Sequence, residues 1–138
     1  MTETNIATTN RAAAPVVPVS WGELFDKVAI LEIKQARLEG ERALANVARE
    51  LDALRVFTEQ ASHEDLPDLL ADLRTINEKL WAHEDDIREL EREKNFSEDF
   101  IAVARAIYRD NDRRAALKRR INTLLGSELR EEKSYKAY

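Results

Sequence analysis

Apolar residues recur at intervals of three and four positions over three stretches of this chain, which is the spacing of one face of an α-helix. The stretches run from Ser20 to about Ala61, from Pro67 to Lys94 and from Glu98 to Leu125. No segment alternates apolar and polar residues as a strand does, and only three Gly and three Pro punctuate the 138 residues. The pattern therefore predicts an all-α protein with three long helices.

The first predicted helix begins with a capping box. Ser20 can accept a hydrogen bond from the backbone of Glu23, whose side chain can return one, and Val19 and Leu24 are placed as a hydrophobic staple. Two overlapping apolar seams follow, so the part from Val28 to Ile33 should be buried on two sides. We expect one continuous helix of about 60 Å at 1.5 Å per residue.

The second and third predicted helices form an antiparallel hairpin, because only a two- or three-residue connection around Asn95 and Ser97 separates them. The second helix starts at Pro67 and carries the clearest heptad of the chain. That heptad consists of Leu66, Leu69, Leu73, Ile76, Leu80, His83, Ile87 and Leu90. The third helix should stop at Gly126. The expected architecture is a coiled-coil-like three-helix bundle, a long N-terminal helix packed on the hairpin, with a short helical tail at the C-terminus.

Length and composition restrict the classes of function. We expect a flexible leader over residues 1–18 and a single helical domain over residues 19–138. The leader lacks a basic start and a long apolar run, so it is not a signal peptide, and no segment has the length of a membrane span. These features predict a cytoplasmic protein. The net charge of -5 argues against a nucleic-acid partner, and the absence of cysteine excludes disulfides, cysteine zinc sites and thiol catalysis.

Polar residues beside the apolar seams of the hairpin are the candidates for a site. If the hairpin turns about Phe96, Glu84 should lie near Tyr108, and Trp81 near Asn111, within about a turn. The cluster could bind a polar ligand or hold a carboxylate at a perturbed pKa. The alternative interpretation is a buried polar network that fixes helix register, or simple i,i+4 pairs. The full candidate set is Trp81, Glu84, Arg88, Arg105, Tyr108, Asn111 and Asp112.

Metal and cofactor sites are not expected. His83 falls on the apolar seam and is interpreted as a satisfied core or interface imidazole. Three consecutive acids, Glu84 to Asp86, point in three directions on a helix and cannot share one ion. A basic run in the third helix is interpreted as complementing the helix dipole. The alternative, functional interpretation is that these residues contact RNA or phosphate. That run is Arg113, Arg114, Lys118, Arg119 and Arg120.

Several segments together resemble a family of small helical proteins from bacteria and phages that is known only as a domain of unknown function. The resemblance covers nearly everything after the leader, and it implies a small helical protein with a link to surface-polysaccharide pathways. The segments are residues 19–24, 26–27, 30–34, 44–47, 80–81, 84–88, 108–112, 114–115, 117–118, 121–122, 126–127 and 131–135.

Two functions from different classes fit these observations. The first is a non-enzymatic binding or scaffolding module, a homodimer or the partner of another protein, because a single hairpin is not expected to cover both apolar faces of the first helix. The alternative is a small all-α enzyme or ligand-binding protein for an anionic small molecule. There Glu84 would be the acid/base or anchor, and Arg88 and Arg105 would be the anion clamps. Tyr108 and Asn111 would supply hydrogen bonds.

Overall fold

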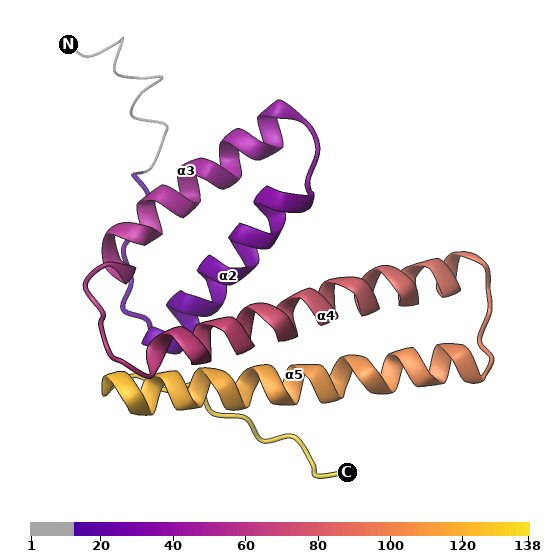
Figure 1. The fold of residues 1–138 in the computed structure, drawn as a ribbon. Coiled ribbons are helices and arrows are strands. Elements are labelled where there is room, and N and C mark those ends of the chain that lie inside the picture. The colour runs from indigo at the N-terminus through magenta and orange to yellow at the C-terminus, as the bar shows by residue number, and fades with distance from the viewer. Residues whose placement is uncertain (1–12) are drawn as a thin grey trace.

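A computed structural model describes residues 13–138, and all the regular structure in that range is helical. The helices are α2 (Trp21–Arg37), α3 (Glu41–Thr58), α4 (Leu66–Arg92) and α5 (Glu98–Leu125). They form two antiparallel hairpins, α2 with α3 and α4 with α5, which meet near the start of α2 (Figure 1). Helix α2 packs on all three of the others, whereas α3 packs closely only on α2 among the described helices. Of the expected leader, residues 13–18 have no regular structure, and residues 1–12 lie outside the described range.

The single helix expected from Ser20 to Ala61 was wrong, and so was the packing of one long helix on a hairpin. The chain breaks over residues 38–40, so α2 is only about 26 Å long at 1.5 Å per residue. Gly40 has a φ of +98°, a conformation that residues with a side chain rarely adopt. This turn folds α3 back onto α2. Both predicted apolar seams are therefore real, but the second one continues on a separate helix.

Residues of α2 between Val28 and Ile33 are buried on two sides, as the seams predicted. One side faces α3, where Val28 and Leu31 pack with Val47 and Leu51. The other side faces the α4–α5 hairpin and forms the main core. That core contains Phe25, Ala29, Leu66, Leu69, Leu73, Ile76, Leu117 and Ile121. Helix α2 is thus the layer that joins the two hairpins.

The predicted helix ends are confirmed at four places. Ser20 accepts a hydrogen bond from the Glu23 backbone (3.1 Å), and Pro67 lies in the first turn of α4. Ser97 is the N-cap residue of α5, although its side chain makes no capping hydrogen bond, and Gly126 ends α5 in the left-handed conformation at φ +66°. The predicted return bond from Glu23 to Ser20 is not observed, because the Glu23 carboxylate accepts from Lys118. The expected fourth helix was wrong, because residues 127–138 form no helix and instead run back along α5. None of the helices in residues 13–138 has the length and apolar character needed to cross a bilayer.

The far end of the α4–α5 hairpin extends away from α2 and α3 (Figure 1). We call residues 81–109 the arm. No residue of the arm is buried, although both of its helices continue their apolar seams. The seam residues are only half-buried: Ile87, Leu90, Phe100, Val103, Ala104 and Ile107. At the base of the arm Arg37 of α2 lies over Trp81. Toward its tip the hairpin is two helices thick, with no third helix against it in the described part of the chain (Figure 1).

Candidate functional site

A buried carboxylate at the centre of α2 joins three helices. Asp26 lies among apolar residues of α2 and is 1% exposed. Its Oδ1 accepts hydrogen bonds from Asn77 Nδ2 of α4 (2.9 Å) and from Arg114 Nε of α5 (2.9 Å). Its Oδ2 accepts from the Nη2 of Arg114 at 2.5 Å. The Asp26 carboxylate therefore forms a bidentate ion pair with the Arg114 guanidinium, which is the strongest geometry for an arginine and a carboxylate.

Lys118 extends this network to the C-terminal tail. Its Nζ lies 2.7 Å from Glu23 and 3.1 Å from Glu131, and 3.9 Å from Asp26. Burial alone would lower the pKa of Lys118, but its hydrogen bonds to the two glutamates outweigh that effect and raise the pKa. The hydrogen bonds to Asp26 likewise raise the pKa of Arg114. Both cations consequently stay charged at neutral pH, and the network is an electrostatic link between α2, α5 and the tail.

The first turn of α2 is capped by residues from the other end of the chain. The backbone N–H of Gly22 donates to Asn122 Oδ1 (2.6 Å), and the N–H of Trp21 donates to Ser127 Oγ (2.9 Å). Helix starts leave such donors without intrahelical partners, so α5 and the tail satisfy them. A Cβ at Gly22 would come within 2.4 Å of the backbone oxygen of Lys118. Glycine is therefore required by the close approach of α2 to α5.

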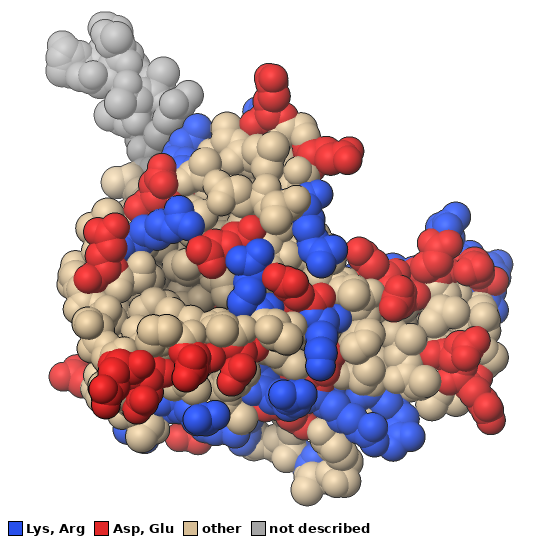
Figure 2. All heavy atoms as spheres, in the orientation of Figure 1, with Lys and Arg blue, Asp and Glu red and all other residues tan. Residues whose placement is uncertain are grey.

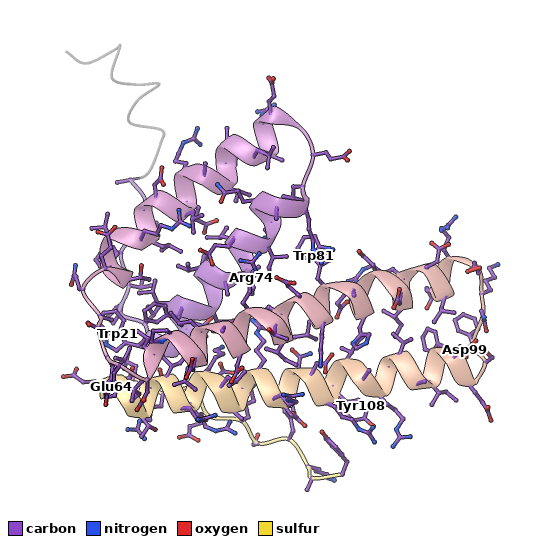
Figure 3. The ribbon with its side chains drawn as sticks, viewed as in Figure 1. Trp21, Glu64, Arg74, Trp81, Asp99 and Tyr108 are labelled. Atoms are coloured by element: carbon purple, nitrogen blue, oxygen red, sulfur yellow. The ribbon has the colours of Figure 1, made fainter. Side chains whose placement is uncertain are left out.

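A cavity of about 330 Å³ opens beside Arg114, between α2, α4 and α5. Its lining includes four of the residues singled out from the sequence: Trp81, Glu84, Arg88 and Asn111. Figure 3 shows Trp81 rising from α4 toward α2, and Arg37 of α2 lies over its ring at 5.8 Å. Glu84 and Arg88 form an i,i+4 ion pair on the exposed side of α4. The cavity thus combines an aromatic wall, two guanidinium groups and two carboxylates, since Asp85 also lines it.

The other three predicted residues lie on a different side of α5. Tyr108 faces the C-terminal tail (Figure 3), where its ring packs edge-on against Tyr138 at 4.9 Å. Asp112 accepts a hydrogen bond from the Tyr138 hydroxyl, which raises the pKa of that tyrosine. Arg105 Nε donates to the Tyr108 hydroxyl at 3.4 Å. The expected meeting of Glu84 and Tyr108 at one level was wrong, because α5 separates them into two cavities that share only Asn111 among the predicted residues.

His83 lies at the interface of α4 and α5 and has a polar partner there, as its position on the apolar seam predicted. Its Nδ1 lies 2.7 Å from the Oδ2 of Asp110, across the α4–α5 interface. In residues 13–138, no group of three or more His, Asp or Glu side chains is arranged to hold a metal ion.

From the sequence, Arg114 and Lys118 were only part of a basic run and Asp26 was not among the candidate site residues, although the three form an ion-pair network around a buried carboxylate. One signal was present. A carboxylate within the apolar face of a helix must have a partner, because an unpaired buried charge is very costly. The identity of that partner depends on how α2 crosses the hairpin, and the spacing of residues along α2 does not contain this information.

Comparison with known proteins gives one match. A family model described as "Family of unknown function (DUF6165)" matches residues 16–138. No curated protein and no solved structure matches the chain. The matched range contains α2 to α5 and the tail, so it includes the Asp26 network, both cavities and the arm.

Proposed function

The chain belongs to the DUF6165 family of unknown function, and we propose that it is a non-enzymatic helical binding module that assembles through its arm. The observation that carries this proposal is the absence of any buried residue over positions 81–109, in a hairpin whose apolar seams continue to its end. Most helical stability in proteins comes from tertiary packing of an apolar face. The arm offers such a face on two helices and buries neither completely.

A second copy of the same chain is the occupant that we propose for this face. Two arms related by a two-fold axis would form an antiparallel four-helix bundle, in which each seam covers the other. The α4 side of the arm, residues 81–94, contains six carboxylates and three cations. In a two-fold pair it would lie beside α5 of the other copy, where Arg105 and Arg109 have no ion-pair partner among the described residues.

The expected dimer is weak. Complete burial of an apolar side chain contributes about 1.5–3 kcal/mol, and the seam residues are already half-buried. Six of them on each copy would therefore add roughly 10 kcal/mol before association costs of about 4–15 kcal/mol are subtracted. The arm is also only about 22 Å long, which places the contact near the small end of specific interfaces. At most about 6 kcal/mol remains, so a dissociation constant of tens of micromolar or weaker is expected.

Sedimentation velocity over a concentration series from low to several hundred micromolar tests this assembly. Ile101→Glu places a charge on the arm at a side chain that is 54% exposed, and it should leave a monomer. Phe57→Glu is the matched control, because Phe57 is 46% exposed at the end of α3, away from the arm. Wild-type protein that stays monomeric over the whole series would refute the proposal. So would dimerisation that Ile101→Glu and Phe57→Glu weaken equally.

A second candidate function rests on the cavity beside Arg114, which brings together Trp81, Arg88 and Asn111. Its volume is at the lower end of the range for small-ligand sites. Arg114 is held in place by buried Asp26, so it is preorganised to meet an anionic group. We infer ligand binding rather than catalysis here, because Glu84 is already paired with Arg88 on the helix surface.

Fluorescence of Trp81 tests this second function directly. Trp21→Phe leaves Trp81 as the only tryptophan, and titration with inorganic phosphate and with short dicarboxylates should then change its emission. The response should be lost in Arg88→Gln. Emission that is unaffected at tens of millimolar of each anion would exclude the cavity as a site for these anions.

A further inference from the structure

Charges on this protein are not evenly spread. Carboxylates gather along the first half of α4, whereas Lys and Arg side chains line the neighbouring edge of α5 (Figure 2). Four of the eight arginines elsewhere in the described chain are in ion pairs: Arg55, Arg74, Arg88 and Arg92. Five arginines of α5 are in no ion pair with the described residues: Arg105, Arg109, Arg113, Arg119 and Arg120.

The helix dipole does not explain these arginines. Its effect is confined to the last turn of a helix, and the last turn of α5 contains no basic residue. The expectation that the basic run complements the dipole therefore does not account for these five arginines. Guanidinium groups without an ion-pair partner are suited to a partner that carries phosphate groups.

A groove of about 830 Å³, lined in part by Arg119, lies between α5 and the C-terminal tail. Tyr108 of α5 and Tyr135 and Tyr138 of the tail line it, and all three are exposed. The groove also contains three cations, Arg119, Lys133 and Lys136, and one carboxylate, Asp112, which is occupied by the Tyr138 hydroxyl. Tyr108 and Tyr138 pack edge-on against each other, and Lys133 lies over the Tyr135 ring and is paired with Glu131. The groove thus brings three aromatic rings together with two cations, Arg119 and Lys136, that are in no ion pair with the described residues.

We propose that this groove binds single-stranded nucleic acid, with bases stacked on the tyrosines and phosphates on the unpaired cations. Proteins that bind single strands combine these two elements, a cationic channel and aromatic stacking platforms. The net charge of -5 argued against a nucleic-acid partner, but that sum hides the separation of charge over the surface. Among the residues that line the groove, cations outnumber carboxylates by three to one.

A single strand fits these observations better than a duplex or a free nucleotide. Bases in a duplex are stacked on each other and are not free to stack on tyrosine rings. Arg113 is exposed on α5 and does not line the groove, so a ligand must continue past the groove to reach it. Arg120 lines a separate hollow with Asp65, Asp68 and Asp72 near the start of α4, and it is not expected to contact the strand.

Fluorescence anisotropy with a labelled oligouridylate at low salt is the first test. The double variant Arg113→Gln/Arg119→Gln should weaken binding at least tenfold. The matched control is Arg42→Gln/Arg49→Gln, which removes the same charge from exposed positions on α3. If four to six phosphates are neutralised, the logarithm of the affinity should fall against the logarithm of salt with a slope of about -3 to -4. Equal losses in the two double variants would overturn the proposal.

Stacking is tested separately from charge. Tyr135→Ala and Tyr138→Ala should each weaken oligouridylate binding roughly tenfold, without a change in helicity by circular dichroism. The proposal is overturned if polyglutamate or a duplex of equal length competes as well as the oligouridylate, or if free uridine monophosphate binds as tightly. Ile101→Glu in the arm should leave oligouridylate binding unchanged. The binding test therefore does not depend on whether the protein dimerises.

Discussion

Substitution of Asp26 by Asn is the sharpest test of how this fold is held together. The change keeps the shape of the side chain and leaves an oxygen that Asn77 can still reach. It removes the negative charge that Arg114 and Lys118 surround. Arg114 would then be a partly buried cation without its main partner.

The size of the loss follows from the burial of the two groups. Removal of one member of a buried ion pair costs about 3–5 kcal/mol, because the remaining charge is uncompensated. Asp26 keeps only 2% of its side chain exposed, but Arg114 keeps 27%, so water can solvate part of the cation. We therefore expect the lower end, about 3 kcal/mol in the free energy of unfolding. For a chain of this length that corresponds to a decrease of roughly 10 °C in Tm.

Urea denaturation followed by circular dichroism measures this free energy. Glu32→Gln is the control on the same helix, since Glu32 also contacts two arginines, Arg55 and Arg74, but is 36% exposed. Exposed ion pairs contribute at most about 1 kcal/mol, so Glu32→Gln should have a small effect. Equal destabilisation by the two variants would refute the reasoning from burial. A second check is Asp26→Asn combined with Arg114→Met, which should be more stable than Asp26→Asn alone because no unpaired charge remains.

Two further variants probe the contact between α2 and the other end of the chain. Gly22→Ala should destabilise the protein by about 1–3 kcal/mol in urea, because its Cβ would lie 2.4 Å from the Lys118 backbone oxygen; unchanged stability would mean that α2 and α5 can separate freely. Glu131→Gln tests pH dependence, since hydrogen bonds from Lys118 and Lys133 lower the pKa of Glu131 below its ordinary value of 4.5. A lowered carboxyl pKa stabilises the folded state above the unfolded pKa and loses that effect as pH falls through the folded pKa, so the Tm difference between wild type and Glu131→Gln should be present at pH 7 and vanish in acid. A difference that persists in acid would exclude this linkage.

Helix ends were predictable where a local signal decides the structure. Ser20 with Glu23, and Gly126 at the end of α5, act through their own backbone neighbours, so the sequence around them is sufficient. The apolar seam of the arm was predictable from the heptad of α4. The heptad alone does not reveal that α2 leaves most of this seam uncovered. Local physics therefore accounts for the helices and most of their limits.

The break at Gly40 was missed because the apolar period continues across it. Two antiparallel helices joined by three residues present the same spacing as one long helix, and Gly40 in phase with the seam was the only sign of a turn. The candidate site was split for a related reason. Counting residues from the hairpin turn gives the level of Glu84 and Tyr108, but the direction of each side chain around its helix decides which cavity it lines.

The capping of α2 by Asn122 and Ser127 has a consequence for synthesis of the protein. The N–H of Trp21 and its acceptor on Ser127 are separated by 106 positions in the chain. At about 5–20 residues per second on the ribosome, α2 is made roughly 5–20 s before its cap exists. During that interval the N–H of Trp21 has no Ser127 acceptor, and Asp26 has no Arg114 until a further 88 residues have been made. Folding of the joined hairpins is therefore expected only after nearly the whole chain has emerged, and a nascent chain stalled before Asn122 should expose the apolar faces of α2 to chaperones.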